Sequence, residues 1–133
     1  MIVLDASVII KWFQDEADSG RALVFEKKHI RGEETVVVPD LLLYEITNVL
    51  SFQKRITASA AESALELLAR MEIQVFTFSS LELKEVFRLA RAYGISAYDA
   101  VYAVLALRLK CQFITADKKL CQKLKTLNWV FLL

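Results

Sequence analysis

The chain begins Met1-Ile2-Val3-Leu4-Asp5-Ala6-Ser7, an apolar run that stops at an aspartate. Consecutive large apolar residues indicate a short strand over residues 2–4 that is buried on both faces, and a helix is expected from about Ser7. Strands of this kind belong to parallel sheets covered by helices, so this stretch decides the fold class. Asp5 then falls at the carboxyl end of a strand, where ligands bind in such sheets.

The rest of the chain alternates between strand-like and helical segments. Apolar, β-branched runs predict further strands over residues 35–38, 73–78, 112–115 and 129–132. Helical spacing and capping signals predict helices over residues 17–31, 40–55, 59–71, 79–94, 96–110 and 118–127. This alternation predicts an α/β protein with a parallel sheet covered by helices.

Length and composition suit one folded domain. The 133 residues are 56% hydrophobic, which excludes a disordered chain, so residues 1–133 are expected to form a single domain with a sizeable core. The longest apolar run, residues 100–107, is far shorter than the roughly 20 residues that a membrane helix needs. The N-terminal segment lacks the layout of a signal peptide. We therefore expect a cytoplasmic protein with no membrane partner.

Histidine, cysteine and charge narrow the possible chemistry. His29 is the only histidine, is expected at the surface and has no neighbour that marks it as a triad base. Cys111 and Cys121 lack the spacing of a zinc site or a redox pair and are expected to be ordinary buried thiols. Residues 105–133 carry six lysines and arginines against Asp117 alone, which suits either a solvated helix face or contact with a polyanion.

Four acidic residues lie beside or within apolar stretches: Asp5, Glu45, Asp99 and Asp117. A carboxylate against apolar walls has to be paired, be protonated or bind a metal. Asp5 and Asp117 each follow a predicted strand. Glu45 and Asp99 fall in the first turns of predicted helices, so all four are expected at one rim of the sheet. The sequence therefore predicts one acidic pocket that holds a cation.

Each acid also has a structural interpretation. Asp5, Asp99 and Asp117 stand where an aspartate caps a helix, and the spacing from Ser96 to Asp99 is that of a capping box. Glu45 lies past the cap position, so its structural alternative is an ion pair with a nearby lysine or arginine. A shared site explains the four acids together, whereas the alternative needs a separate reason for each.

Polar residues near the acids have two interpretations each. Ser7 either hydrogen-bonds a metal-bound water or caps a helix, and Thr115 either orients a carboxylate or is simply a strand residue. Asn48, on the same helical face as the acid three residues before it, reaches either substrate or a helix neighbour. Tyr98 and Tyr102 are predicted to lie in the core rather than to stack on bases.

Four motifs in this order, spanning essentially the whole chain, resemble one known family. They are Val3-Leu4-Asp5-Ala6-Ser7-Val8, Pro39 followed by Glu45-Ile46-Thr47-Asn48-Val49-Leu50, Ser96-Ala97-Tyr98-Asp99-Ala100, and Ile114-Thr115-Ala116-Asp117-Lys118-Lys119-Leu120. Together they resemble the PIN-domain family and, within it, the VapC-type toxin ribonucleases of toxin–antitoxin pairs. Each motif alone is weak, and the four together are specific.

The resemblance implies a three-layer α/β/α sandwich with a short, mostly parallel sheet, and an endoribonuclease that depends on Mg²⁺ or Mn²⁺. The residues that match the family's metal site are Asp5, Glu45, Asp99 and Asp117, with Ser7, Asn48 and Thr115 as polar neighbours. Where many relatives carry a further acid, this chain has Lys118 and Lys119, which argue against a complete second metal site and suit contacts to phosphate. The implied partners are an RNA substrate, a small antitoxin protein and a second copy of the chain in a homodimer.

Within such a site, Asp5 and Asp99 are expected to be the principal metal ligands. Glu45 is expected to bind the metal or to orient the attacking water, and Asp117 to complete the shell or hold a second, weaker ion. Carboxylate oxygens are the ligands that Mg²⁺ and Mn²⁺ favour. A divalent ion there stabilises negative charge on a phosphate and activates water.

Two other classes of function remain open. A phosphotransfer protein also places an aspartate after its first strand, but haloacid-dehalogenase-like phosphatases need a second aspartate where this chain has Ser7. Receiver domains need paired acids at that strand end and a phosphate-accepting aspartate after a middle strand. A non-catalytic interaction module would use the acids as helix caps only. Metal-dependent cleavage of RNA discriminates between the three.

Overall fold

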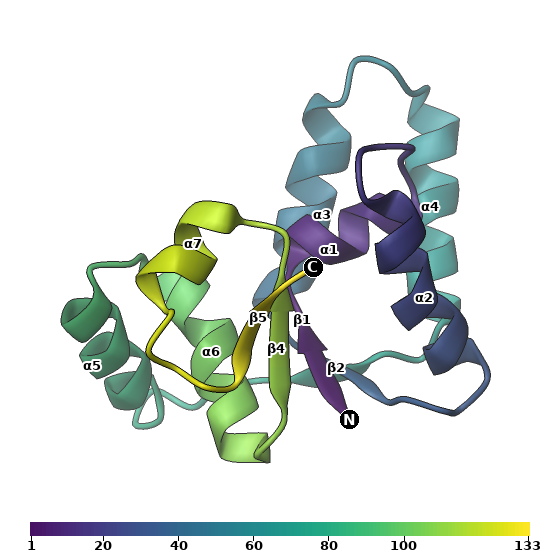
Figure 1. The fold of residues 1–133 in the computed structure, drawn as a ribbon. Coiled ribbons are helices and arrows are strands. Elements are labelled where there is room, and N and C mark those ends of the chain that lie inside the picture. Colours follow the sequence, from purple (N-terminus) through teal and green to yellow (C-terminus); the bar gives the residue numbers. More distant parts are fainter.

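A computed structural model describes residues 1–133 and shows a five-stranded sheet with helices around it (Figure 1). The strands are β1 (Ile2–Leu4), β2 (Val36–Pro39), β3 (Gln74–Phe76), β4 (Gln112–Thr115) and β5 (Val130–Leu132). Their order in the sheet is β3-β2-β1-β4-β5, and every neighbouring pair is parallel. The predicted α/β class is confirmed, and the sheet is wholly rather than mostly parallel.

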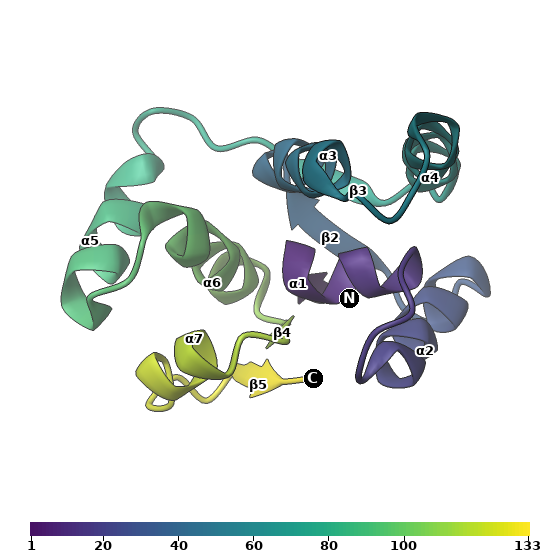
Figure 2. The ribbon, with the colours of Figure 1, turned by 90° about the horizontal axis from the view of Figure 1, so that it is seen from above.

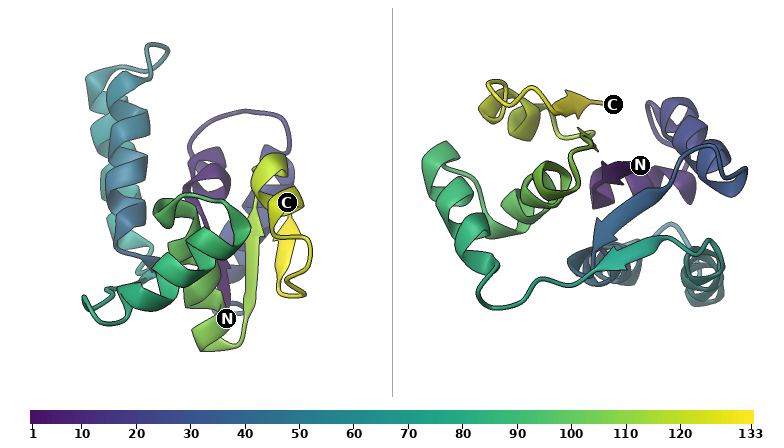
Figure 3. Two further views of the ribbon diagram at one scale, coloured as in Figure 1. Left: turned by 90° about the vertical axis from the view of Figure 1, so that its left-hand side faces the viewer. Right: turned by 90° about the horizontal axis from the view of Figure 1, so that it is seen from below.

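Helices cover both faces of this sheet, as the α/β/α sandwich requires. They are α1 (Ala6–Ile9), the 3₁₀ turn η1 (Ile10–Trp12), α2 (Ser19–Ile30), α3 (Leu41–Phe52), α4 (Ala58–Arg70), α5 (Leu83–Tyr93), α6 (Ala97–Leu109) and α7 (Lys118–Lys123). Seen from above and below, α5 and α6 lie on one side of the sheet and α1 and α2 on the other (Figures 2 and 3). Helices α3 and α4 form a pair that rises beyond the carboxyl ends of the strands (Figure 3, left).

The order of the strands creates a crevice at the centre of the sheet. From β1 the chain moves outward through β2 to β3, and then returns to the other side of β1 to form β4 and β5. The connections that leave β1 and β4 therefore diverge. In parallel sheets this is the point at which ligands bind, beyond the carboxyl ends of the two strands.

One hydrophobic cluster joins the sheet to its covering helices. Every residue of α6 from Ala100 to Ala106 is buried, because the helix packs against β1, β2 and β4 on one side and against α5 on the other. The Tyr102 ring stacks on Phe113 of β4, with ring centroids 5.9 Å apart. No helix of the structure has both the length and the apolar character needed to cross a membrane. The apolar run of α6 is therefore a core helix.

Several predicted boundaries differ from the structure for local reasons. Helix α4 begins after Thr57 rather than at Ser59, because the Thr57 hydroxyl accepts a hydrogen bond from the Ala60 amide at 3.1 Å. Strand β3 is limited to the residues that pair with β2. His29 is half-buried rather than free at the surface. Its Nε2 lies 2.8 Å from the Met71 carbonyl oxygen, and it thereby ties the end of α2 to the end of α4.

Candidate active site

Asp5 follows β1 and caps α1 at the central crevice. Its Oδ1 accepts hydrogen bonds from the Val8 amide, at 3.2 Å, and from the Ser7 hydroxyl. Only 7% of the residue is exposed. Burial raises the pKa of Asp5 from 3.8 to about 6, although the hydrogen bonds that it accepts act in the opposite direction. Asp5 is thus a desolvated carboxylate held in one orientation.

Ser7 joins the ends of β1 and β4. Its Oγ donates to Asp5 and accepts a hydrogen bond from the Ala116 amide at 2.8 Å. Thr115, fully buried at the end of β4, accepts from the Asp117 amide through its Oγ1 at 3.0 Å. Both hydroxyls therefore hold the ends of the two strands and the residues that follow them in place.

Glu45 lies in α3 and is half-buried, with its Oε2 accepting a hydrogen bond from the Tyr102 hydroxyl. The alternative of an ion pair is wrong, because none of the ion pairs in the structure involves Glu45. Burial raises the pKa of Glu45 most, and the negative charges of Asp5 and Asp99 raise it further. Asp5, which follows β1, and Asp99 of α6 are thus close enough to Glu45 for their charges to repel it.

Tyr102 is a site residue that the sequence interpretation missed. Its ring is buried, as predicted, but its hydroxyl fixes the Glu45 carboxylate. Burial, together with the neighbouring Glu45, raises the pKa of Tyr102 far above its usual range, so the hydroxyl stays a donor. The sequence does contain one indication of this role. Tyr102 follows Asp99 by three residues, which puts both side chains on one face of α6.

Asp99 lies in the first turn of α6 and forms the predicted capping box. The Ser96 hydroxyl accepts a hydrogen bond from the Asp99 amide at 3.0 Å and donates to Asp99 Oδ2 at 2.7 Å. This arrangement holds the Asp99 carboxylate at the end of α6 that faces the carboxyl edge of the sheet.

Asp117 follows β4 by two residues and caps α7. Its Oδ1 accepts from the amides of Lys119 and Leu120, at 2.8 and 3.0 Å. Asp117 is more exposed than the other three acids and is not among the charges that shift the Glu45 pKa. Lys118 and Lys119 begin α7, are exposed and take part in no ion pair. Asp117 therefore lies at the edge of the acidic group.

Three of the four acids keep one carboxylate oxygen that their structural roles leave free. In each of them one oxygen accepts the hydrogen bonds and the other has no hydrogen-bond partner in the structure; the free atoms are Glu45 Oε1, Asp99 Oδ1 and Asp117 Oδ2. As the side chains stand, no three aspartate, glutamate, histidine or cysteine residues lie close enough to hold one metal ion together. Mg²⁺ commonly binds through one or two carboxylates and keeps several waters. The arrangement therefore suits a hydrated ion better than an all-protein cage.

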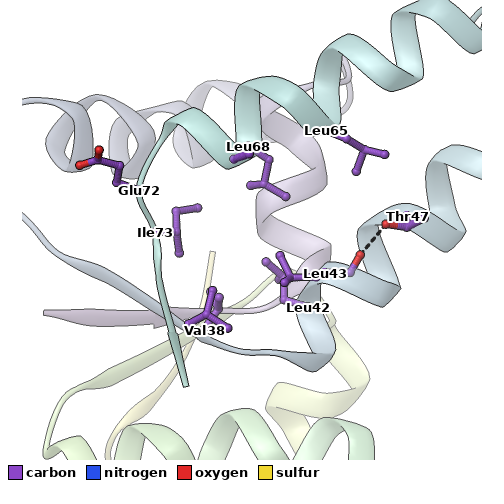
Figure 4. A pocket seen from close by; sticks show the side chains of 10 residues that line it. Val38, Leu42, Leu43, Thr47, Leu65, Leu68, Glu72 and Ile73 are labelled. Carbon is purple, nitrogen blue, oxygen red and sulfur yellow. Dashed lines mark hydrogen bonds between the residues drawn. The ribbon is translucent and has the colours of Figure 1, made fainter. Parts of the chain in front are cut away.

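Two hollows flank α3, and they differ in character. On the side of α4 and β3 is an apolar groove of about 270 Å³ lined by residues such as Leu42, Leu68 and Ile73 (Figure 4). None of the four acids lines this groove, and the Thr47 hydroxyl at its rim is already bonded to the Leu43 carbonyl at 2.7 Å. The other hollow, on the side of α6, contains Glu45.

Comparison with known proteins identifies the family. The family model described as PIN domain matches residues 2–124, so the chain belongs to the PIN-domain family. Ribonuclease VapC3 of Pyrobaculum aerophilum is 27% identical over 131 residues, which is 95% of this chain and 96% of the relative. Ribonuclease VapC9 of Mycobacterium tuberculosis is 29% identical over 123 residues, 90% of this chain and 88% of the relative.

Solved structures agree with the fold. The crystal structure of PAE2754 from Pyrobaculum aerophilum superposes with a TM-score of 0.71 at 26% identity, covering 92% of this chain and 78% of that one. A toxin–antitoxin complex from Klebsiella pneumoniae contains a chain that superposes with a TM-score of 0.67 at 14% identity, covering 98% and 96%. The five-stranded α/β fold is therefore that of PIN-domain proteins.

Proposed function

We propose that this chain is a divalent-metal-dependent endoribonuclease that hydrolyses RNA phosphodiester bonds, and that it is the toxin of a type II toxin–antitoxin pair. The observation that carries the proposal is the approach of Asp5 and Asp99 to the half-buried Glu45, whose pKa is raised by burial and, further, by the charges of these two aspartates. The similarity to ribonucleases VapC3 and VapC9 over most of the chain supports RNA as the substrate.

The residues present fit a divalent cation. Crowded, partly buried carboxylates repel one another, and a cation between them removes that repulsion. We assign Asp5 and Asp99 as the principal ligands of Mg²⁺ or Mn²⁺, and Asp99 Oδ1, which accepts no hydrogen bond in the structure, is free to bind the ion. Glu45 would bind the same ion or orient water, and Asp117 would complete the shell or hold a second, weaker ion. When bound, the ion supplies charge stabilisation at the phosphate and an activated water.

The surrounding residues hold these acids in place. Ser7 and the Val8 amide fix one oxygen of Asp5, and the Tyr102 hydroxyl fixes one oxygen of Glu45, so each side chain presents its other oxygen in a defined direction. Lys118 and Lys119 are exposed beside Asp117, and we propose that they contact RNA phosphates. Asn48 and Thr115 support substrate binding and strand-end geometry respectively.

The partners follow from the same family. A small antitoxin protein is proposed to hold the ribonuclease inactive, because a structural neighbour of this chain comes from a toxin–antitoxin complex. We further propose a homodimer that acts in the cytoplasm, and residues 1–133 as a single nuclease domain, which the one continuous hydrophobic cluster supports.

A non-catalytic interaction module is the second candidate, because Asp5, Asp99 and Asp117 do serve as helix caps. Capping does not explain Glu45, which lies beyond the first turn of α3 and is held by a buried tyrosine instead. It also leaves unexplained why acids from three elements lie within range of one another's charge.

The test is cleavage of defined RNAs by the purified full chain with Mg²⁺, with Mn²⁺ and with a chelator. We expect RNA cleavage only with metal and a large loss of cleavage on Asp99→Asn. Glu66→Gln changes an exposed acid of α4 that does not line the cleft containing Glu45, and we expect it to cleave normally. A protein whose melting temperature rises with Mn²⁺ but which cleaves no RNA would contradict the proposal and favour a binding module.

A further inference from the structure

We propose that a base of single-stranded RNA, next to the phosphate that is cut, stacks on Tyr44 and Tyr98 in the open cleft between α3 and the start of α6. This inference rests on the proposed ribonuclease function and deepens it. It assigns two binding residues outside the acidic group and predicts that the preferred substrate is unpaired at this position.

The first observation is the exposure of the two tyrosines. Tyr44 is 74% exposed and Tyr98 is 67% exposed, and both line the same cleft. The prediction that Tyr98 belongs to the core is therefore wrong. The aromatic pairs of the structure are Phe76–Phe78 and Tyr102–Phe113, so neither exposed ring is covered by another ring. Both rings are available to a ligand.

The second observation is their position relative to the acids. Tyr44 directly precedes Glu45 in α3, and Tyr98 directly precedes Asp99 in α6. Glu45 itself lines the cleft. Because each ring is anchored one residue from an acid of the site, a base held between α3 and α6 has its phosphate close to the acidic group.

The third observation is the chemistry of the cleft. Its volume is about 540 Å³, within the range of roughly 300–1,000 Å³ that is common for ligand sites. Glu45 is the only charged residue that lines it, and the others are neutral: Leu41, Tyr44, Thr47, Asn48, Ser51 and Tyr98. A phosphate would be repelled by Glu45, whereas the uncharged face of a base suits tyrosine rings. The cleft therefore fits a base rather than the RNA backbone.

Asn48 supplies a polar group for the edge of such a base. Its side chain forms no hydrogen bond in the structure and lies in the cleft one helical turn after Tyr44. A free amide offers two donors and one acceptor, which is the pattern needed to pair with a base edge. Ser51, the next residue of this stripe, donates to the Thr47 carbonyl at 2.8 Å and keeps its acceptor capacity.

The experiment measures RNA binding separately from cleavage. Fluorescence anisotropy with a short single-stranded RNA is recorded for the Asp99→Asn chain, which does not cut, and for the same chain carrying Tyr44→Ala or Tyr98→Ala. Removal of one stacking ring is expected to weaken binding by about 5- to 150-fold, the equivalent of about 1–3 kcal/mol per base. Tyr44→Phe and Tyr98→Phe keep the ring and are expected to bind within about twofold of the parent chain.

Two controls tie the effect to stacking. Phe87→Ala removes a ring that is 58% exposed on α5, outside the cleft, and is expected to leave binding unchanged. An RNA with an abasic nucleotide at the cut position is expected to bind the parent chain and the alanine variants equally. Circular dichroism and the phenylalanine variants exclude loss of folding as the cause.

Three outcomes overturn the inference. The first is unchanged RNA binding by both alanine variants. The second is that the alanine variants lose as much affinity for the abasic RNA as they lose for the intact RNA. The third is that light scattering gives the alanine variants a lower molar mass than the parent chain while their RNA binding is unchanged. This result would make the two tyrosines part of an interface between copies of the chain. Failure of the unmodified chain to cleave the same RNAs is a different result and contradicts the proposed function itself.

Discussion

The two halves of the acidic site are built differently. In the half at β1 and β4, Asp5 is buried and braced, because the Ser7 hydroxyl donates to Asp5 and accepts from the Ala116 amide. The half formed by the starts of α3 and α6 is open, with exposed tyrosines beside Glu45 and one tertiary hydrogen bond to hold that acid. The comparison teaches that one half supplies a fixed carboxylate at the expense of stability, while the other half leaves room for substrate.

The largest expected effect comes from removing an acid of either half. Asp5→Asn and Asp99→Asn are each expected to lower the rate of RNA cleavage by about 10²–10⁴-fold, the range that a single catalytic group commonly contributes. The measurement is single-turnover cleavage at saturating Mg²⁺. If Asp5→Asn is inactive and Asp99→Asn retains full activity, Asp99 is not a metal ligand and our assignment of it is wrong.

The second prediction concerns stability without metal and separates the halves by pH. The pKa of Asp5 is 3.8 when unfolded and about 6 when folded, so the folded chain holds this proton more tightly. Below pH 3.8 the Asp5 carboxyl is protonated in both states, so the raised pKa does not lower the free energy of unfolding. As the pH rises from 3.8 through 6, the free energy of unfolding falls. Above pH 6 the loss reaches ~3 kcal/mol, which corresponds to a difference of about 2 in pKa.

Asp5→Asn removes this titration and is expected to be more stable than the wild type by up to ~3 kcal/mol at pH 7.5 and by much less at pH 4. Chelator-treated proteins unfolded in urea at both pH values provide the measurement. Ser51→Ala, which changes an exposed residue that does not titrate, serves as the control and should differ from the wild type by the same amount at both pH values. Equal stability of wild type and Asp5→Asn at both pH values contradicts this prediction.

The third prediction tests the hydrogen bond that holds Glu45 in the open half. Tyr102→Phe keeps the buried ring and deletes the hydroxyl that holds Glu45, so we expect Mn²⁺ to bind about 10–100-fold more weakly, as is common when a supporting hydrogen bond is lost. Isothermal titration gives the affinity. Tyr93→Phe, which removes a hydroxyl 3.2 Å from Thr126 Oγ1, is the control and should bind Mn²⁺ normally. Loss of affinity in both variants would point to a general structural effect.

The smallest expected effect tests the buried half in the same way. Ser7→Ala leaves the Ala116 amide and one lone pair of Asp5 without a partner and is expected to lower the free energy of unfolding by about 1–2 kcal/mol. Urea denaturation measures the loss. Ser51→Ala, at an exposed position of α3, should change stability by less than about 0.5 kcal/mol. A neutral Ser7→Ala would show that the two strand ends do not depend on this bridge.

Helices and strands could be predicted from the sequence better than the side-chain contacts between them. Apolar runs revealed β1 and β4, and the acid after each was placed at the correct edge because the strand end defines it. The pairing of Glu45 with Tyr102 could not be found from local pattern, since it joins two helices through the folded core. Tyr98 and Tyr102 share helical spacing, yet only Tyr102 is buried, because Tyr98 lies in the first turn, before α6 reaches the sheet.

The place of β1 in the middle of the sheet also governs when the protein becomes active during synthesis. Val3 pairs with Phe113, so the central pair of strands forms only after the first 113 residues have been translated. Pairings between such remote segments are slow to form because a long loop must close first. Until that step Asp5 remains hydrated and apart from Asp99, and we therefore expect a nascent chain on the ribosome to be harmless to nearby RNA.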